Sequence, residues 1–416
     1  MSEIKVAVIQ DGARLHYAVP LAFQHAGMLN ALYTDWYNRR TLFTKLSISL
    51  ARLISASNAD RMQQRRVDQF DNVPIYDYPL LFHGIYLARK PGRIRSAISQ
   101  WSIKQIRSRE RRLGPIADGK IDLVFAFSNL LDIADMQWIK NKGCLLIVDQ
   151  PLASTREMSS QRIHDTHYWP GWEEALAASH DEGPQILHEL QTSLWADHIT
   201  CASDYVKKSL MNLEVNPKKI SVVPYPLDAT PFPFVDRSGR TGPVTVGIVG
   251  TVNLRKGAPV VLQIAKRFST EKLRFVWVGI PTLSPQRTDE LRKFVDLIGP
   301  VPRSQIPEWL GKFDIFLLAS RSEGSAGALM EAMATGLPVV TTTNSGTVAR
   351  DGIEGYIRGI DDIDGLATAI EKLSLDAELR LSMGRAARQR VLNFNIEWYS
   401  RSLADLATQL FEKKIC

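Results

Sequence analysis

Residues 313–340 constrain this sequence most, because they read as strand, glycine-bearing loop, short helix and second strand in direct succession. Residues 313–318 form an apolar run of strand length, and residues 326–334 are mostly good helix formers. Gly336 then ends the helix, and Pro338 starts the next strand. A loop that feeds a helix start presents unpaired N–H groups and the positive end of the helix dipole. The pattern therefore predicts a phosphate-binding strand–loop–helix unit.

Two glutamates bracket this unit. Glu323 precedes the loop and Glu331 lies within the helix, with seven residues between them. A carboxylate on either side of a bound phosphate can accept hydrogen bonds from hydroxyl groups, as the acidic residue of a dinucleotide fold does with ribose. The plainer interpretation is one βαβ unit whose glutamates lie on the surface.

The glutamate pair, followed by Gly-Leu-Pro-Val-Val at 336–340, resembles the signature of glycosyltransferase family 4. The resemblance implies an α/β chain of the GT-B fold, in which two Rossmann-like, doubly wound domains face a cleft. It also implies that Glu323 meets the donor sugar and that Glu331 meets the ribose hydroxyls of a nucleotide-sugar. The resemblance is strong over the second half of the chain and weak over the first.

A second strand-to-helix loop supplies positive charge. Residues 244–250 read as a strand, and Arg255 and Lys256 lie between its end and the next helix start. Two cations there can clamp a diphosphate, although a solvated basic loop would have the same sequence pattern. Family members carry an early arginine where this chain has Thr251, so the resemblance makes Arg255 its replacement. The resemblance further assigns donor binding to Gly250, Arg303, Gly324, Ser325, Ala326 and Gly327.

Neither a metal ion nor a cofactor is expected. The chain has no Asp-x-Asp cluster in a suitable loop, and Arg255, Lys256 and the helix start can stabilise the departing diphosphate. His164 and His167 have a spacing that could bind metal, but structural zinc sites rarely lack cysteine. Solvent-facing or acceptor-loop histidines are the favoured interpretation.

Candidates for acceptor binding or for a general base lie in the first half of the chain. Residues 4–9 read as a buried strand, and Arg14 and His16 follow in the loop at its carboxyl end, where open α/β sheets bind ligands. Residues 144–148 read as another strand, which ends at Asp149. Family members often carry a histidine near this point, so the role of Asp149 stays open. A loop histidine without a task is the alternative for His16.

The length of 416 residues predicts two domains. Alternating strands and helices indicate a Rossmann-like acceptor-binding domain over residues 1–228 and a proline-rich linker over 229–240. A nucleotide-sugar-binding, Rossmann-like domain is expected over 241–394. Residues 395–416 resemble the family's closing helix, which packs back on the first domain.

The formal net charge of +7 favours an anionic partner. Basic residues gather in segments 39–66 and 89–112, among apolar residues. A basic amphipathic helix can lie on an anionic membrane surface. An ordinary helix with a solvated basic face has the same pattern, so both interpretations stay open. Nucleic acid is not expected, because no helix-turn-helix, zinc or RNA-stacking motif accompanies the charge.

Cysteine usage and the first residues indicate a cytoplasmic location. The three cysteines are far apart and odd in number, which argues for a reducing compartment. The first apolar run is too short for a signal peptide and ends at Asp11. No stretch has the length of a spanning helix without charges. We therefore expect a cytoplasmic protein, either free or peripheral on the inner face of the membrane.

These features predict a metal-independent, retaining hexosyltransferase. It would move a sugar from a nucleotide-sugar to a glycan or lipid-linked acceptor in polysaccharide or glycolipid biosynthesis. The leaving phosphate oxygen can take the acceptor proton in a retaining transfer, so no strong enzymic base is required. Two alternatives stay open, namely a nucleotide-sugar epimerase or phosphorylase of the same fold and a non-catalytic GT-B-like subunit of a membrane assembly.

Overall fold

The computed structural model describes residues 4–54, 56–77, 114–173, 182–268 and 272–415. The chain divides into two compact units. The first comprises Met1–Gln150, Leu190–Thr200 and Tyr399–Cys416, and the second comprises Pro151–Glu189 and Cys201–Trp398. The basic segment expected at 89–112 lies outside the described residues.

This division departs from the single boundary expected near residue 228. Two helices before that point, α7 (Thr155–Tyr168) and α9 (Asp204–Met211), belong to the second unit. The attachment of α7 is polar, since its Asp165 pairs with Arg321. An ion pair of this kind leaves no trace in hydrophobic periodicity, which indicates only the helices and strands. The expected boundary is the proline-rich stretch 229–240, and that stretch does not show which unit the earlier helices join.

Seven strands of the described chain form the first sheet, in the order β3-β2-β1-β4-β5-β6-β7. β1 pairs in parallel with β2 and β4, β2 with β3, and β4 with β5. The central strands β1, β4 and β5 are buried along their whole length, as in parallel sheets covered on both faces. The strands are β1 (Val6–Ile9), β2 (Leu29–Thr34), β3 (Ile75–Asp77), β4 (Leu123–Phe127), β5 (Leu145–Gln150), β6 (His198–Cys201) and β7 (Ile220–Val222).

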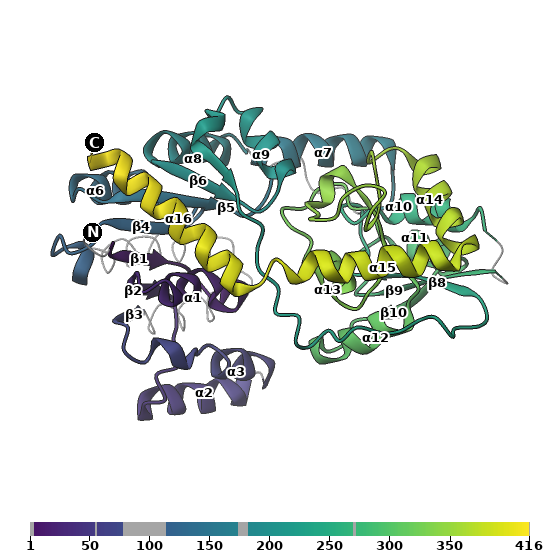
Figure 1. Cartoon of the computed structure of the whole chain (residues 1–416), viewed down its shortest axis with the longest axis horizontal. Helices are drawn as coiled ribbons and strands as arrows, with labels where there is room; N and C mark the ends of the chain where they lie inside the picture. The colour runs from purple at the N-terminus through teal and green to yellow at the C-terminus, as the bar shows by residue number, and fades with distance from the viewer. Residues whose placement is uncertain (1–3, 55, 78–113, 174–181, 269–271, 416) are drawn as a thin grey trace. The chain divides into compact units, whose positions relative to one another are not determined.

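The last helix of the chain, α16, belongs to the first unit from Tyr399 onward (Figure 1). The Ser400 hydroxyl donates to the Ala22 carbonyl at 2.5 Å, and the Lys414 amine donates to the Gly143 carbonyl. The helices of this part of the chain are α1 (Ala18–His25), α2 (Leu42–Ile54), α3 (Ala56–Gln63), α6 (Ile133–Asn141), α8 (Gly183–Trp195), which spans the division, and α16 (Ile396–Ile415).

The second sheet has six strands among the described residues, in the order β10-β9-β8-β11-β12-β13. All five pairings between neighbours are parallel. The strands are β8 (Val244–Val249), β9 (Leu273–Val278), β10 (Asp296–Gly299), β11 (Ile315–Leu318), β12 (Val339–Thr342) and β13 (Gly355–Arg358). The helices are α10 (Ala258–Ala265), α11 (Pro285–Arg292), α12 (Ile306–Lys312), α13 (Gly327–Ala334), α14 (Ile363–Leu375) and α15 (Ala377–Leu392).

Strand β11 shows why this sheet is covered on both faces. Ile315 and Leu317 belong to one buried apolar cluster, whereas Phe316 and Leu318 belong to another. Alternate side chains of a strand point to opposite faces, so the two clusters are the two layers of core on either side of the sheet. Two Rossmann-like parallel sheets confirm the fold class predicted from the sequence.

Candidate active site

The switch point of the second sheet brings together the two loops singled out in the sequence. Strands β8, β9 and β10 are added in one direction and β11, β12 and β13 in the other, so β8 and β11 are neighbours. Ile315 lies opposite Val246 in the register of this pair. Open α/β sheets bind ligands beyond the carboxyl ends of the strands at such a point. The loop after β8 carries Arg255 and Lys256, and the loop after β11 carries Glu323.

The two loops are joined by close backbone contacts. The Arg321 N–H donates to the Arg255 carbonyl at 2.8 Å. Gly257 has a φ of 78°, and a Cβ at this position would come within 2.1 Å of the Ala319 carbonyl oxygen. Only glycine permits both the left-handed conformation and this approach. Gly257 therefore brings the basic loop against the end of β11.

Glu323 is paired with both cations of the basic loop. Its carboxylate lies 2.7 Å from the Lys256 amine and also accepts a hydrogen bond from the Arg255 guanidinium. About 10% of the Glu323 side chain and 11% of the Lys256 side chain are exposed, whereas the Arg255 side chain is 48% exposed. Burial lowers the pKa of the Lys256 amine, and the charge of Glu323 counteracts that shift. The cluster carries a net single positive charge, and Arg255 is the member free to reach a ligand.

The start of α13 lies directly after this cluster. Among the described residues no side chain caps this helix, whose N-cap is Ala326 and whose first residue is Gly327. Its N-terminus therefore keeps the N–H groups and dipole that suit a phosphate. Gly324 is required before it, because a Cβ there would lie 1.7 Å from the Pro151 carbonyl oxygen. Ser325 between them is partly exposed.

Glu331, on α13, forms a separate pair with Arg303. Two guanidinium nitrogens of Arg303 contact its two carboxylate oxygens, one of them at 3.0 Å. The Glu331 side chain is 5% exposed and that of Arg303 is 66% exposed. Burial raises the pKa of Glu331, and the bond to Arg303 opposes that shift. The carboxylate is turned inward, so the accessible group of this pair is the guanidinium.

We expect Arg303→Ala to destabilise the second unit by about 1–2 kcal/mol at neutral pH, because Glu331 then stays buried without a partner. This is below the roughly 3–5 kcal/mol of a fully buried pair, since Arg303 is mostly exposed. Losing Arg303 raises the pKa of Glu331 further. The native state then holds this proton up to a higher pH than the unfolded chain does, so the penalty shrinks as pH falls towards the ordinary carboxyl range.

Urea unfolding of wild type and variant at about pH 7.5 and about pH 5 measures this effect. The matched control is Arg274→Ala, because Arg274 pairs with Asp296 and both side chains are about half exposed. This control should cost well under 1 kcal/mol. A stability loss for Arg303→Ala that is the same at both pH values would contradict the role given to Glu331.

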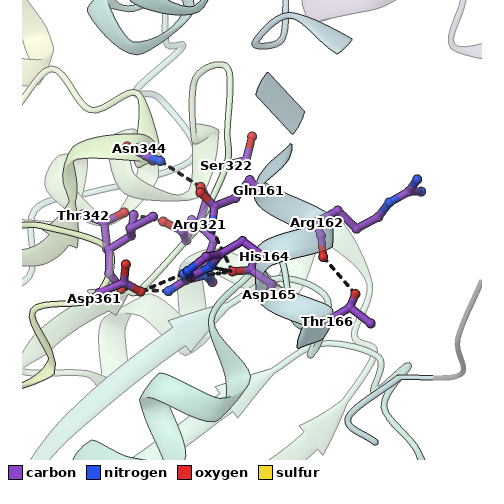
Figure 2. Close-up of polar contacts among 12 residues, drawn as sticks. Gln161, Arg162, His164, Asp165, Thr166, Arg321, Ser322, Thr342, Asn344 and Asp361 are labelled. Atoms are coloured by element: carbon purple, nitrogen blue, oxygen red, sulfur yellow. Dashed lines mark hydrogen bonds and ion pairs between the residues drawn. The ribbon is translucent and has the colours of Figure 1, made fainter. Parts of the chain in front are cut away.

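Arg321 is a site residue that the sequence reasoning missed (Figure 2). Its side chain is fully buried and donates to the carboxylates of Asp165, on α7, and Asp361, the latter at 2.8 Å. It also donates to the Ile360 carbonyl at 2.9 Å. Its own carbonyl accepts from the Asn344 side chain at 3.0 Å (Figure 2). Arg321 therefore fixes the backbone two residues before Glu323.

Further polar bonds hold the same loop. The Glu323 N–H donates to the Asn344 carbonyl at 2.9 Å. The Ser203 hydroxyl donates to the Gly324 carbonyl at 2.6 Å, and the Tyr205 hydroxyl bonds the Ser322 hydroxyl at 3.1 Å. The loop that carries Glu323 is therefore held from several sides within the second unit, as a preorganised ligand site requires.

Comparison with known proteins adds the family context. Residues 243–376 match the family model described as "Glycosyl transferases group 1". The putative colanic acid biosynthesis glycosyltransferase WcaL of Salmonella typhimurium is 28% identical over 223 residues, which are 49% of this chain and 54% of that protein. The UDP-Gal:alpha-D-GlcNAc-diphosphoundecaprenol alpha-1,3-galactosyltransferase of Escherichia coli is 28% identical over 227 residues, 49% and 58% respectively. The chain thus spans little more than half the length of these curated relatives.

Solved structures match over nearly the whole chain. Alr3699/HepE of Anabaena, in complex with UDP, has a TM-score of 0.62 at 12% identity and covers 98% of this chain and 100% of that one. The apo form of the lipopolysaccharide outer core galactosyltransferase WaaB has a TM-score of 0.60 at 13% identity, with 97% and 100% covered. The fold is that of the GT-B glycosyltransferases. The family match covers residues 243–376, which lie in the second parallel-sheet domain of this GT-B chain.

The acceptor-side candidates lie in the first unit of the GT-B chain. His16 belongs to a short turn, Arg14–Tyr17, directly after β1, and it is exposed. The φ values of Leu15, His16 and Tyr17 are 51°, 52° and 63°, which is unusual for residues other than glycine. The side chain of Arg14 lies outside the described part. Backbone of this kind is often found at functional sites.

Asp149 is placed differently from His16. It is the penultimate residue of β5, its side chain is buried, and it accepts a hydrogen bond from the Thr200 hydroxyl at 2.7 Å. This hydrogen bond joins β5 to β6, which are neighbours in the first sheet, so Asp149 has a structural role.

The histidine pair of α7 forms no metal cluster. His164 contacts Asp165, with 3.4 Å between its Nδ1 and a carboxylate oxygen. Within the described ranges, no group of three or more histidine, cysteine, aspartate or glutamate residues is arranged to hold a metal ion.

Proposed function

We propose that this chain is a retaining, nucleotide-sugar-dependent glycosyltransferase of polysaccharide or glycolipid biosynthesis, acting on a glycan or lipid-linked acceptor. The observation that carries the proposal is the cluster of Glu323, Arg255 and Lys256 at the switch point, directly before the uncapped start of α13. A positive cluster next to a helix N-terminus suits a diphosphate, and the carboxylate between the cations suits sugar hydroxyls.

In the proposed mechanism the side chains of this cluster change partners when the donor binds. Arg255 and Lys256 leave Glu323 and pair with the diphosphate, which lies against the start of α13. Glu323 is thereby released to accept hydrogen bonds from hydroxyl groups of the donor sugar. As the bond from the sugar to the phosphate breaks, the two cations and the helix dipole stabilise the charge that develops on the leaving oxygen. This supply of positive charge by side chains supports a metal-independent reaction.

The acceptor is assigned to the first unit, with the exposed His16 as the group to test there. The leaving phosphate oxygen takes the proton of the acceptor hydroxyl, so the buried Asp149 is not needed as a base. Arg303, held by Glu331, is placed on the nucleoside side of the donor. The relative named for a GlcNAc-diphosphoundecaprenol substrate supports a lipid-linked acceptor, and the one named for colanic acid biosynthesis supports polysaccharide assembly.

The donor is tested by ligand-induced thermal shift with a panel of UDP-, GDP- and ADP-sugars, since a ligand that binds the native state raises its melting temperature. UDP compounds come first, because structures similar to this chain contain UDP. A protein that no nucleotide or nucleotide-sugar stabilises would refute the proposal and leave a non-catalytic subunit.

With the stabilising donor in hand, we expect Glu323→Gln to lower product formation by about 10–100-fold. The charge that accepts the sugar hydroxyls is lost, and a hydrogen bond to a charged group contributes roughly 1.5–3 kcal/mol. The affinity for the nucleoside diphosphate alone should stay the same or increase, because Arg255 and Lys256 lose their internal partner. Steady-state kinetics and calorimetry on one preparation measure both effects. Unchanged turnover, or loss of nucleotide binding together with turnover, would contradict the role of Glu323.

A further inference from the structure

Helix α2 of the first unit buries only part of its apolar surface, including Ile48. Thr44 and Ser47 on its inner face are buried. Four leucines point outward instead, at positions 42, 46, 50 and 53, with exposed fractions of 75%, 56%, 62% and 84%. At 3.6 residues per turn they fall within an arc of about 80° on the helix surface. A helix normally buries such a stripe.

The inner face of α2 is already satisfied. α2 packs side by side with α3 (Figure 1). The small apolar cluster of this region consists of Trp36, Ile48, Ala59 and Met62. Hydrogen bonds also hold this pair of helices to the rest of the unit. In one of them the Asn38 side-chain amide donates to the carbonyl of Gln63, at the end of α3, at 3.0 Å. The outward leucines are therefore not needed to hold α2 and α3 together.

The surroundings of the leucine face are strongly basic. Residues 39–66 contain seven lysines and arginines and a single acid, a local charge of +6 in a chain of +7. Several of these arginines are partly neutralised by aspartates, among them Arg52 by Asp60 and Arg66 by Asp68 and Asp71. Lys45 is exposed on α2 next to the leucine arc.

A cavity of about 680 Å³ adjoins α2 at its base. Arg40, Lys45 and Arg66 line it together with amide and hydroxyl side chains, and Asp68 is its acidic residue. Three cations around one acid suit an anionic headgroup such as a phosphate. Lys45 belongs both to this cavity and to the helix that carries the leucines.

We infer that the outward leucine face of α2 docks on an anionic lipid bilayer, with the alkyl side chains at the level of the acyl boundary and Arg40 and Lys45 on lipid phosphates. An alkyl stripe flanked by cations is the composition expected of a helix that lies in the plane of the membrane interface. No helix in the described part of the chain is long and apolar enough to cross a membrane. The inference rests on the proposed function for its biological purpose, which is to bring the enzyme to a lipid-linked acceptor.

The test is vesicle co-sedimentation of the full chain with vesicles of phosphatidylglycerol and phosphatidylcholine and with vesicles of phosphatidylcholine alone. Wild type should bind the anionic vesicles, and the double variant Leu46→Gln, Leu50→Gln should bind about tenfold more weakly or worse. Glutamine is a good helix former, so these exposed positions should tolerate it. The matched control is Leu187→Gln, Leu194→Gln on α8, whose leucines are 55% and 77% exposed. The control should bind like wild type.

Arg40→Ala, Lys45→Ala should weaken binding to the anionic vesicles, and added salt should do the same for wild type. Equal binding of wild type and the α2 double variant would overturn the inference. So would a concentration-dependent dimer that the α2 variant abolishes without any vesicle binding, because the face would then be an interface between copies. A thermal shift with the panel of UDP-, GDP- and ADP-sugars is measured on every variant. Vesicle binding without a nucleotide-induced shift would support the membrane docking and refute the proposed function. A nucleotide-induced shift without vesicle binding would support the proposed function and refute the membrane docking.

Discussion

Replacing Lys256 by methionine is expected to lower kcat by about 10²–10³-fold, a larger effect than the one expected for Glu323→Gln. Methionine keeps most of the buried volume and removes the charge. Loss of one preorganised group that stabilises a developing negative charge raises a barrier by roughly 2.7–4 kcal/mol. Steady-state kinetics with the identified donor measure kcat and KM separately. KM should change less than kcat, because the interaction strengthens as the phosphate leaves.

The control for this substitution is Lys266→Met at the end of α10, an exposed lysine paired with Glu290. It removes the same charge from the same domain and should leave kcat unchanged. The pH profile offers an independent check, because burial lowers the pKa of Lys256 whereas Glu323 raises it. In Glu323→Gln the alkaline limb of the remaining activity should therefore move to lower pH. A kcat within a few-fold of wild type for Lys256→Met would remove this lysine from the mechanism.

Arg321→Met is expected to give the largest loss of stability, about 3–5 kcal/mol. Arg321 is fully buried and Asp165 is 5% exposed, so the substitution leaves a buried carboxylate without its arginine, although the Gln161 amide still donates to it. Urea titration followed by circular dichroism measures the loss. The unfolding transition that the stabilising nucleotide-sugar shifts identifies the second unit, since the two units need not unfold together.

The double variant Arg321→Met, Asp165→Leu separates pairing from packing. Two apolar side chains leave no buried charge, so the double variant should recover much of the stability that the single variant loses. Asp361→Asn tests the exposed end of the network, where the aspartate side chain is 60% exposed, and should cost less than 1 kcal/mol. A double variant no more stable than Arg321→Met would show that the shape of the arginine, and not the charge balance, holds α7 in place.

The elements that carry Arg255, Lys256 and Glu323 could be predicted from the sequence because the signals there are local. Strand, glycine-containing loop, helix and Gly336 follow one another within residues 313–340, and the structure has β11, α13 and β12 in this order. Arg255 and Glu323 are 68 residues apart. Parallel strand order nevertheless places their loops side by side, so the pair follows from the topology. These are the parts where local propensity and global fold agree.

Arg321, Asp165 and the leucine face of α2 could not be predicted in the same way. Asp165 is 156 residues before Arg321 and lies on α7, a helix polar on all sides, so periodicity gives no sign that it packs against the loop of Glu323. Arg321 itself had one usable signal, a charge directly after a buried strand at its ligand-binding end. For α2 the sequence shows the apolar stripe and the basic residues, but only the packing against α3 reveals which side points outward.

The ion pairs of Glu323 with Arg255 and Lys256 have a consequence for ligand selectivity, because many other phosphate compounds compete for the same cations. Without a donor, this acid is the counter-ion of both cations, so an incoming anion must displace it and leave a buried carboxylate unsatisfied. Inorganic phosphate and nucleotides without a second sugar have no sugar hydroxyl beyond the phosphates to donate to that carboxylate. A nucleotide that carries a sugar supplies hydroxyl groups to it at the same moment. The resting cluster would thus discriminate against abundant metabolites that resemble only half of the donor.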